Sequence, residues 1–99
     1  MKDAIFWIID ILNGVKGNIL AKVLDIRKIE NRLRFQLRLA EGDIIDANCF
    51  ENHYKKIKWT KDQERIENLI NTEKIFHIEP KKRPLGELYW FNITNIFEV

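Results

Sequence analysis

Cysteine and histidine are scarce in this sequence of 99 residues, and their scarcity excludes two kinds of cross-link. The single cysteine, Cys49, has no partner for an internal disulfide bond. One thiol and two histidines, His53 and His77, are too few ligands for a closed structural zinc site. We therefore expect no metal and no cofactor, and a lone free thiol is typical of a cytoplasmic protein.

A hydrophobic run long enough to cross a membrane is also missing. In the most apolar part of the chain, Asp3 and Asp10 enclose only six residues, whereas a transmembrane helix needs about 20. No small-residue cleavage pattern follows, so we expect neither a targeting signal nor membrane association. Segment 1–17 is predicted to be an apolar lead-in that closes the bottom of the domain. Contact with a protein partner, or with a second copy in a homo-oligomer, is the alternative role of this segment.

The charge balance and the lack of catalytic motifs narrow the choice of function. Seventeen basic against fifteen acidic residues leave a net charge of +2, which barely favours polyanionic partners. There is no glycine-rich phosphate loop. Neither histidine stands in a pattern suited to a catalytic triad, and no base is placed to activate Cys49. We expect a binding protein with no catalytic residues rather than an enzyme.

The sequence does contain stretches in which apolar and polar residues alternate, the pattern of a half-buried β-strand. A first strand is expected from Asn18 to about Ile29, with Lys22 on its outward side. The second strand is the clearest, because four apolar residues alternate with polar ones. Its inward residues are Leu33, Phe35, Leu37 and Leu39, and its outward residues are Arg32, Arg34, Gln36 and Arg38. One side of this strand is therefore apolar and the other basic.

The third predicted strand, Ile44 to Phe50, completes an antiparallel meander. Its inward residues are Ile45, Ala47 and Cys49, and its outward residues are Asp46, Asn48 and Phe50. A polar turn at Glu30 and Asn31 joins the first two strands, and a turn that contains Gly42 joins the second and third.

The remaining chain is predicted to contain one helix and two more strands. Thr60 and Gln63 have the spacing of a capping box, which predicts a helix from about Lys61 to Asn71. A fourth strand is expected around Ile75 to Ile78, ended by Pro80, and a fifth from Glu87 to Val99. A short turn formed by Tyr54, Ile57 and Trp59 is expected to pack under the sheet.

Five strands with a helix between the third and the fourth is the order of the OB-fold, a small Greek-key β-barrel. We therefore predict an all-β protein, a single OB-fold domain of residues 1–99 with its barrel from 18 to 99. From Ile9 onward the sequence also resembles the DNA-binding domains of replication protein A and of archaeal single-strand-binding proteins. The stretches that carry this resemblance are IIDILNGVKGNILAKV, RFQLRLAEGDIIDANCFENHYKKI and ELYWFNITNIFEV.

The resemblance implies three binding residues. Phe50 falls where the family stacks an aromatic ring on a base, and Trp90 falls near the second such position. Lys22 falls where the family often has a basic residue that reaches the phosphates. Strand parity supports the two rings, because it places Phe50 and Trp90 outward while their neighbours face the core.

Basic side chains are expected to hold the backbone of the bound strand. On the outward face they are Arg32, Arg34 and Arg38, with Lys22 and the polar Asn48 beside them. The loop between strands four and five adds Lys81, Lys82 and Arg83 at the border of the binding groove of an OB-fold.

Single-stranded DNA is the expected ligand, with RNA as the alternative, in replication or repair. The rival expectation is an OB-fold interaction subunit of a larger nucleic-acid-processing assembly. The weak net charge and the outward Asp46 favour this rival, whereas the two outward rings favour nucleic-acid binding.

Overall fold

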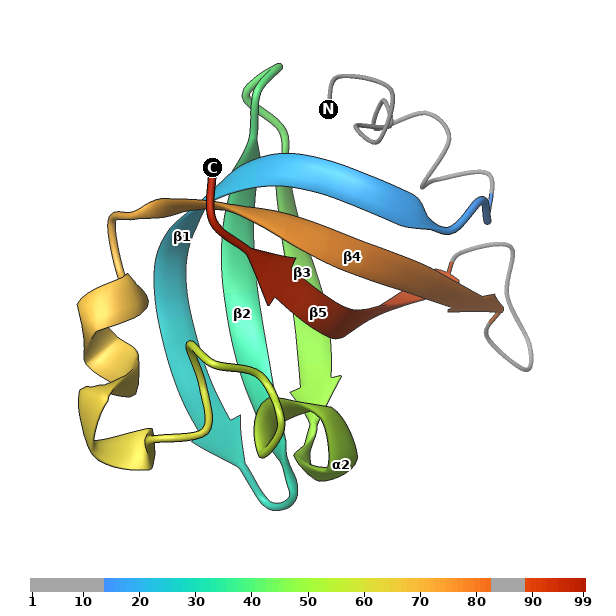
Figure 1. The fold of residues 1–99 in the computed structure, drawn as a ribbon. Helices are drawn as coiled ribbons and strands as arrows, with labels where there is room; N and C mark the ends of the chain where they lie inside the picture. The colour runs from blue at the N-terminus through green and yellow to red at the C-terminus, as the bar shows by residue number, and fades with distance from the viewer. Residues whose placement is uncertain (1–13, 83–88) are drawn as a thin grey trace.

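A computed structural model describes residues 14–82 and 89–99, and these form a closed five-stranded β-barrel (Figure 1). Its strands are β1 (Gly17–Ile29), β2 (Arg32–Leu39), β3 (Ile44–Phe50), β4 (Glu73–Lys82) and β5 (Tyr89–Phe97). They follow the order β1, β2, β3, β5, β4 around the barrel, and β4 pairs with β1 to close it. This confirms the predicted fold class, a five-stranded OB-like barrel.

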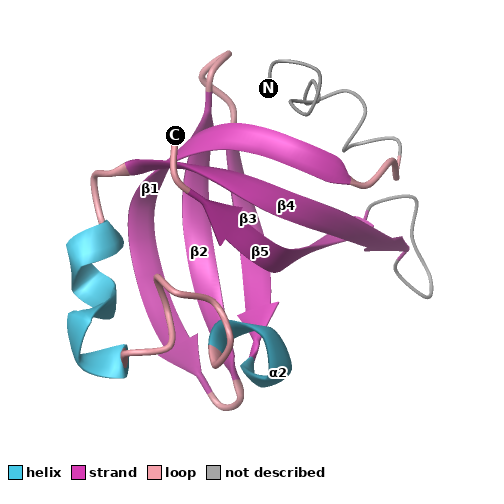
Figure 2. Ribbon diagram, viewed as in Figure 1, coloured by secondary structure: helices cyan, strands magenta, loops and turns pink. Residues whose placement is uncertain are grey.

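Two short helical segments connect β3 to β4. They are α2 (Glu51–Tyr54) and the 3-10 helix η2 (Gln63–Leu69), and Figure 2 shows both outside the wall of strands. As expected, this connection packs against the barrel, since Tyr54 and Ile57 are buried in the core and Trp59 is half-buried against it. None of the helices in the described part of the chain is long and apolar enough to cross a membrane.

The barrel interior is filled by the side chains that alternation predicted to face inward. Those of the first three strands are Ile19, Ala21, Val23, Leu33, Phe35, Leu37, Leu39, Ala47 and Cys49, all buried. Ile45, also predicted to face inward, is only half-buried and packs against this core. Phe35 meets Phe76 of β4 edge to face, with ring centroids 5.9 Å apart. The exposed or half-buried positions between them in β2 are the polar ones, so the basic outer face of this strand is confirmed.

Both predicted turns of the meander are present. The β1–β2 connection consists of Glu30 and Asn31, and Glu30 adopts a positive φ of 52°. Gly42, between β2 and β3, has a φ of 96°, a conformation that L side chains rarely adopt. The tight turns fix the antiparallel register, in which Arg32 lies opposite Phe50 and Arg34 opposite Asn48.

The helix predicted from Lys61 to Asn71 is wrong in length, type and cap. The segment forms the shorter 3-10 helix η2, and its N-cap is Asp62, whose carboxylate accepts a hydrogen bond from the Glu64 amide at 3.1 Å. Thr60 does not cap it, because its hydroxyl is buried and donates to the carbonyl of Tyr54 at 2.7 Å. The Thr60 hydroxyl is therefore used within the connection between β3 and η2 and is not available to cap the helix.

The fourth strand does not end at Pro80 as predicted. It starts at Glu73 and continues through Pro80 to Lys82, paired with β5 along this part. Its pairing with β1 ends at Ile78, so within the described residues Pro80 lies in a part of β4 that has only one partner strand. A proline is tolerated there, since no second strand requires its missing N–H. The fifth strand is described from Tyr89 to Phe97, so it ends two residues before the predicted Val99, and its predicted start at Glu87 lies outside the described residues.

Cys49 provides a test of the packed core. Its side chain is fully buried, and burial raises the pKa of the thiol to about 12. We expect the native protein at pH 8 to react with a disulfide reagent such as DTNB only as fast as it opens, and the unfolded protein to react at once. A rapid reaction of one thiol in the native state would contradict the described packing.

Candidate nucleic-acid interface

The outer face of the barrel carries both predicted rings where β3 meets β5. These two strands run parallel, with Asn48 opposite Asn92. Phe50 lies two residues after Asn48, and Trp90 lies two residues before Asn92, so all four occupy the same face by strand parity. The two rings therefore flank the asparagine pair from opposite sides, offset along the strands by roughly 13 Å between their backbones.

A shallow pocket of about 180 Å³ lies between these side chains. The residues that line it come from four neighbouring strands and are Arg32, Asn48, Phe50, Lys81, Trp90 and Asn92. Arg32 is the cross-strand partner of Phe50, and Lys81 is the cross-strand partner of Trp90. Each aromatic ring therefore has a cation on the adjacent strand.

Burial differs sharply among the lining residues. Trp90 is 45% exposed, Phe50 is half-buried, and Asn48 is only 9% exposed. Asn48 was expected to face outward, and strand parity does not indicate how little of it is exposed. It does point out of the barrel, but it lies in the middle of the face, between Arg34 on β2 and Asn92 on β5. Longer side chains around it exclude most of the solvent.

The positive charge of this face is only partly neutralised within the described residues. The Nε atom of Arg32 is buried and has no hydrogen-bond partner there. Arg34 pairs with Asp46, with 3.3 Å between Nη2 and Oδ2, and both side chains are about half exposed. An exposed pair of this kind stabilises the fold by less than about 1 kcal/mol, so Arg34 is easily released to another anion.

The other predicted phosphate-binding residues are not all gathered at this pocket. Lys22 lies opposite Arg38 on β2 and opposite Glu73 on β4. That position is six residues from Arg32 along β2, or roughly 20 Å. Arg34 lines a neighbouring hollow of about 220 Å³ that also reaches Trp90.

The predicted basic loop is described only at its start. Lys81 and Lys82 are exposed at the end of β4, where Lys82 pairs with Tyr89. Arg83 lies outside the described residues, as do residues 1–13 of the predicted apolar lead-in.

Sequence reasoning missed Asn92 as a site residue. Parity carried the signal, since Asn92 lies two residues after Trp90 and therefore on the same face. What parity alone does not reveal is that Asn92 stands directly opposite Asn48.

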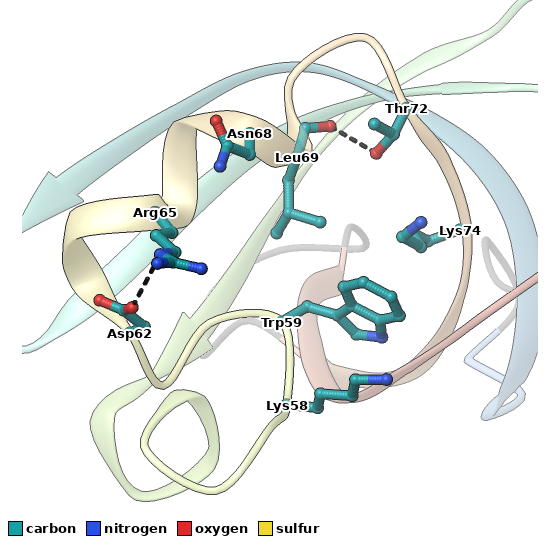
Figure 3. A pocket seen from close by; sticks show the side chains of 8 residues that line it. All are labelled: Lys58, Trp59, Asp62, Arg65, Asn68, Leu69, Thr72 and Lys74. Carbon is teal, nitrogen blue, oxygen red and sulfur yellow. Dashed lines mark hydrogen bonds and ion pairs between the residues drawn. The ribbon is translucent and has the colours of Figure 1, made fainter.

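A larger hollow, of about 430 Å³, lies beside η2 and the start of β4 (Figure 3). The Lys74 ammonium is 4.3 Å from the centre of the Trp59 ring and 3.1 Å from the carboxylate of Glu98, and Lys58 is 4.8 Å from the same centre. Lys74 of β4 is buried. Its contacts reach Trp59, in the connection before η2, and Glu98, which follows β5. Cation–π and ionic contacts hold this cluster together.

Comparisons of the chain with protein-family models, with curated proteins and with solved structures give no match. The resemblance to the domains of replication protein A therefore stays a prediction. Among the described residues, no group of three or more His, Cys, Asp and Glu side chains is placed to hold a metal ion.

Proposed function

We propose that the protein binds single-stranded nucleic acid, DNA in the first place, through the face where β3 meets β5. One observation carries the proposal. Phe50 and Trp90, from two strands that are distant in sequence, line the same pocket, with Arg32 and Lys81 on the flanking strands. An OB-fold that binds single strands needs stacking surfaces and a positive border in this combination.

The exposure of the Trp90 ring supports the stacking role. A tryptophan that is 45% exposed keeps much apolar surface in water, and a stacked base removes that surface from solvent. Phe50 is half-buried, so one part of its ring is anchored while another part lines the pocket. Anchored rings lose little conformational entropy when a base binds, so stacking on them is efficient.

The positive charges of this face suit a nucleic-acid backbone that passes along the edge of the pocket. Arg32 and Lys81 lie at opposite sides of the pocket, and Arg34 lines the neighbouring hollow. Because the net charge of the whole chain is only +2, we expect moderate affinity that falls as salt rises. A role in replication or repair, where single strands are exposed, follows from this ligand.

A fluorescence titration tests the proposal. The parent protein is titrated at low salt with a short single-stranded DNA, the RNA of the same sequence and the corresponding duplex. A Trp59→Phe variant removes the signal of the other described tryptophan, which lies in the separate cluster beside η2. We expect saturable quenching by single strands and little by duplex. No saturation at high micromolar concentration would overturn the proposal.

A protein-interaction subunit is the second candidate, and one observation favours it. The hollow next to the pocket is lined by polar side chains that include Arg34 and Asp46, and also by Ile44, which is 52% exposed. Apolar surface of this kind is common where another protein docks. Failure of every single strand to quench the tryptophans would leave this candidate as the better account.

The basic loop gives a prediction about salt. If it contacts phosphates, replacing Lys81, Lys82 and Arg83 together by alanine should weaken binding and flatten its salt dependence. The slope of log K against log salt should fall by up to ~0.7 for each phosphate of a single strand that the protein no longer neutralises. The measurement is a set of binding isotherms at several salt concentrations.

A matched variant controls for the change in net charge. Replacing Lys56, Lys61 and Arg65 by alanine removes the same three charges from exposed positions outside the pocket. We expect this variant to keep a slope close to that of the parent. Equal slopes for the two triple variants would show that the loop makes no particular contact with phosphates.

A further inference from the structure

The floor of the pocket carries polar groups that lack hydrogen-bond partners among the described residues, Asn48 and the buried Nε of Arg32. Asn48 is only 9% exposed, yet its side chain forms no hydrogen bond with any residue of 14–82 or 89–99. The amide atoms of Asn48 keep some contact with solvent, whereas the Nε of Arg32 in the same pocket is fully buried and has no partner among the described residues. A buried donor without a partner destabilises a fold by about 1–3 kcal/mol. A ligand group that supplies the missing hydrogen bonds therefore binds at an advantage, and one that does not is rejected.

The surroundings of this amide indicate the kind of ligand. Asn48 and Asn92 stand side by side on β3 and β5, with Phe50 beyond one end of the pair and Trp90 beyond the other. A base stacked on either ring would bring its edge close to the amide pair. The buried Nε of Arg32, also without a described partner, adds a donor to the same pocket. Rings at the sides and polar groups at the floor match a nucleobase.

We propose that Asn48, assisted by Asn92, reads the edge of one base in the bound strand, and that this base is adenine. The proposal rests on the proposed function and adds base preference to it. An asparagine amide pairs with a donor beside an acceptor, as in its contact with N6 and N7 of adenine. A single-stranded base exposes both its Watson–Crick and Hoogsteen edges, and adenine offers a donor next to an acceptor on each of them.

Single-base substitutions in the ligand test the proposal. Oligothymidines of equal length carry one central adenine, cytosine, thymine, or a purine analogue that lacks the 6-amino group. The analogue stacks as a purine but cannot donate from that position. We expect the parent to bind the adenine ligand at least about fivefold more tightly than the analogue, the lower end of the effect of a bidentate contact.

Substitution of the protein completes the test. Asn48→Leu keeps the side-chain volume close and removes the hydrogen bonds, so the preference for adenine over the analogue should disappear while both still bind. Asn68→Leu, at an exposed position of η2 outside the pocket, should keep the preference. Thermal unfolding checks that both variants are folded. If Asn48→Leu does not fold, Asn92→Leu replaces it, and disappearance of the preference is again expected.

The outcomes distinguish this inference from the proposed function on which it rests. Equal binding of all four ligands by the parent overturns the base-reading role and leaves single-strand binding intact. A preference that survives Asn48→Leu and Asn92→Leu also overturns it. Absence of binding to every oligonucleotide overturns both the inference and the proposed function.

Discussion

Replacing Phe50 or Trp90 by alanine is expected to weaken single-strand binding by roughly 1–3 kcal/mol in each case, because each change removes a surface on which a base stacks. The double variant should lose nearly all detectable binding. Phosphate contacts alone, on a chain of net charge +2, give only weak and salt-sensitive attraction. Fluorescence anisotropy of a labelled oligonucleotide measures these affinities without relying on the tryptophans.

Phe97 provides a matched control for the two rings. It is an aromatic residue of the same strand as Trp90, it is 40% exposed, and it does not line the pocket. Phe97→Ala should leave affinity nearly unchanged. If it weakens binding as much as Trp90→Ala, the ligand does not select the described pocket. If the Phe50 and Trp90 variants bind like the parent, the stacking site is wrong.

A core substitution should have the largest effect on stability. Phe35 is fully buried and packs edge to face on Phe76, so Phe35→Ala is expected to lower the free energy of unfolding by roughly 3–5 kcal/mol. Denaturant titration followed by circular dichroism gives this value. Trp90→Ala should cost much less, since nearly half of its side chain is already in solvent. Equal destabilisation by the two changes would mean that Trp90 serves the fold rather than a ligand.

The sequence predicted most of the barrel because its strands have one solvated face. In β2, four buried apolar residues alternate with polar ones, and this period of two specifies both the strand and its inward face. Short turns at Glu30–Asn31 and Gly42 then set the register between β1, β2 and β3. The exposure of Trp90 followed from the same parity.

Features that depend on contacts other than the alternation of a strand could not be predicted in this way. The hydroxyl of Thr60 bonds a carbonyl six residues earlier instead of capping a helix, and Pro80 is accepted because β4 has a single partner strand there. Asn48 is buried because Asn92 and other side chains from adjacent strands surround it. Periodicity identifies the face on which a residue lies but not which side chains from other strands cover it.

The predicted basic residues of β2 show the same limit of local patterns. Arg32 and Arg38 belong to one alternating set on β2, yet only Arg32 lines the pocket with the rings. Arg38 lies near the other end of the strand, beside Lys22. Residues that share a face can thus be separated by the length of a strand, roughly 20 Å in this case.

Amide and indole NMR spectra recorded with a short adenine-containing single strand test the central claim most directly. The claim is that the ligand occupies the face between Phe50 and Trp90. We expect the side-chain signals of Trp90, Asn48 and Asn92 to shift in a saturable manner, while the indole signal of Trp59 stays in place. Shifts confined to Trp59 and the residues around Lys74, with Trp90 unmoved, would contradict the account.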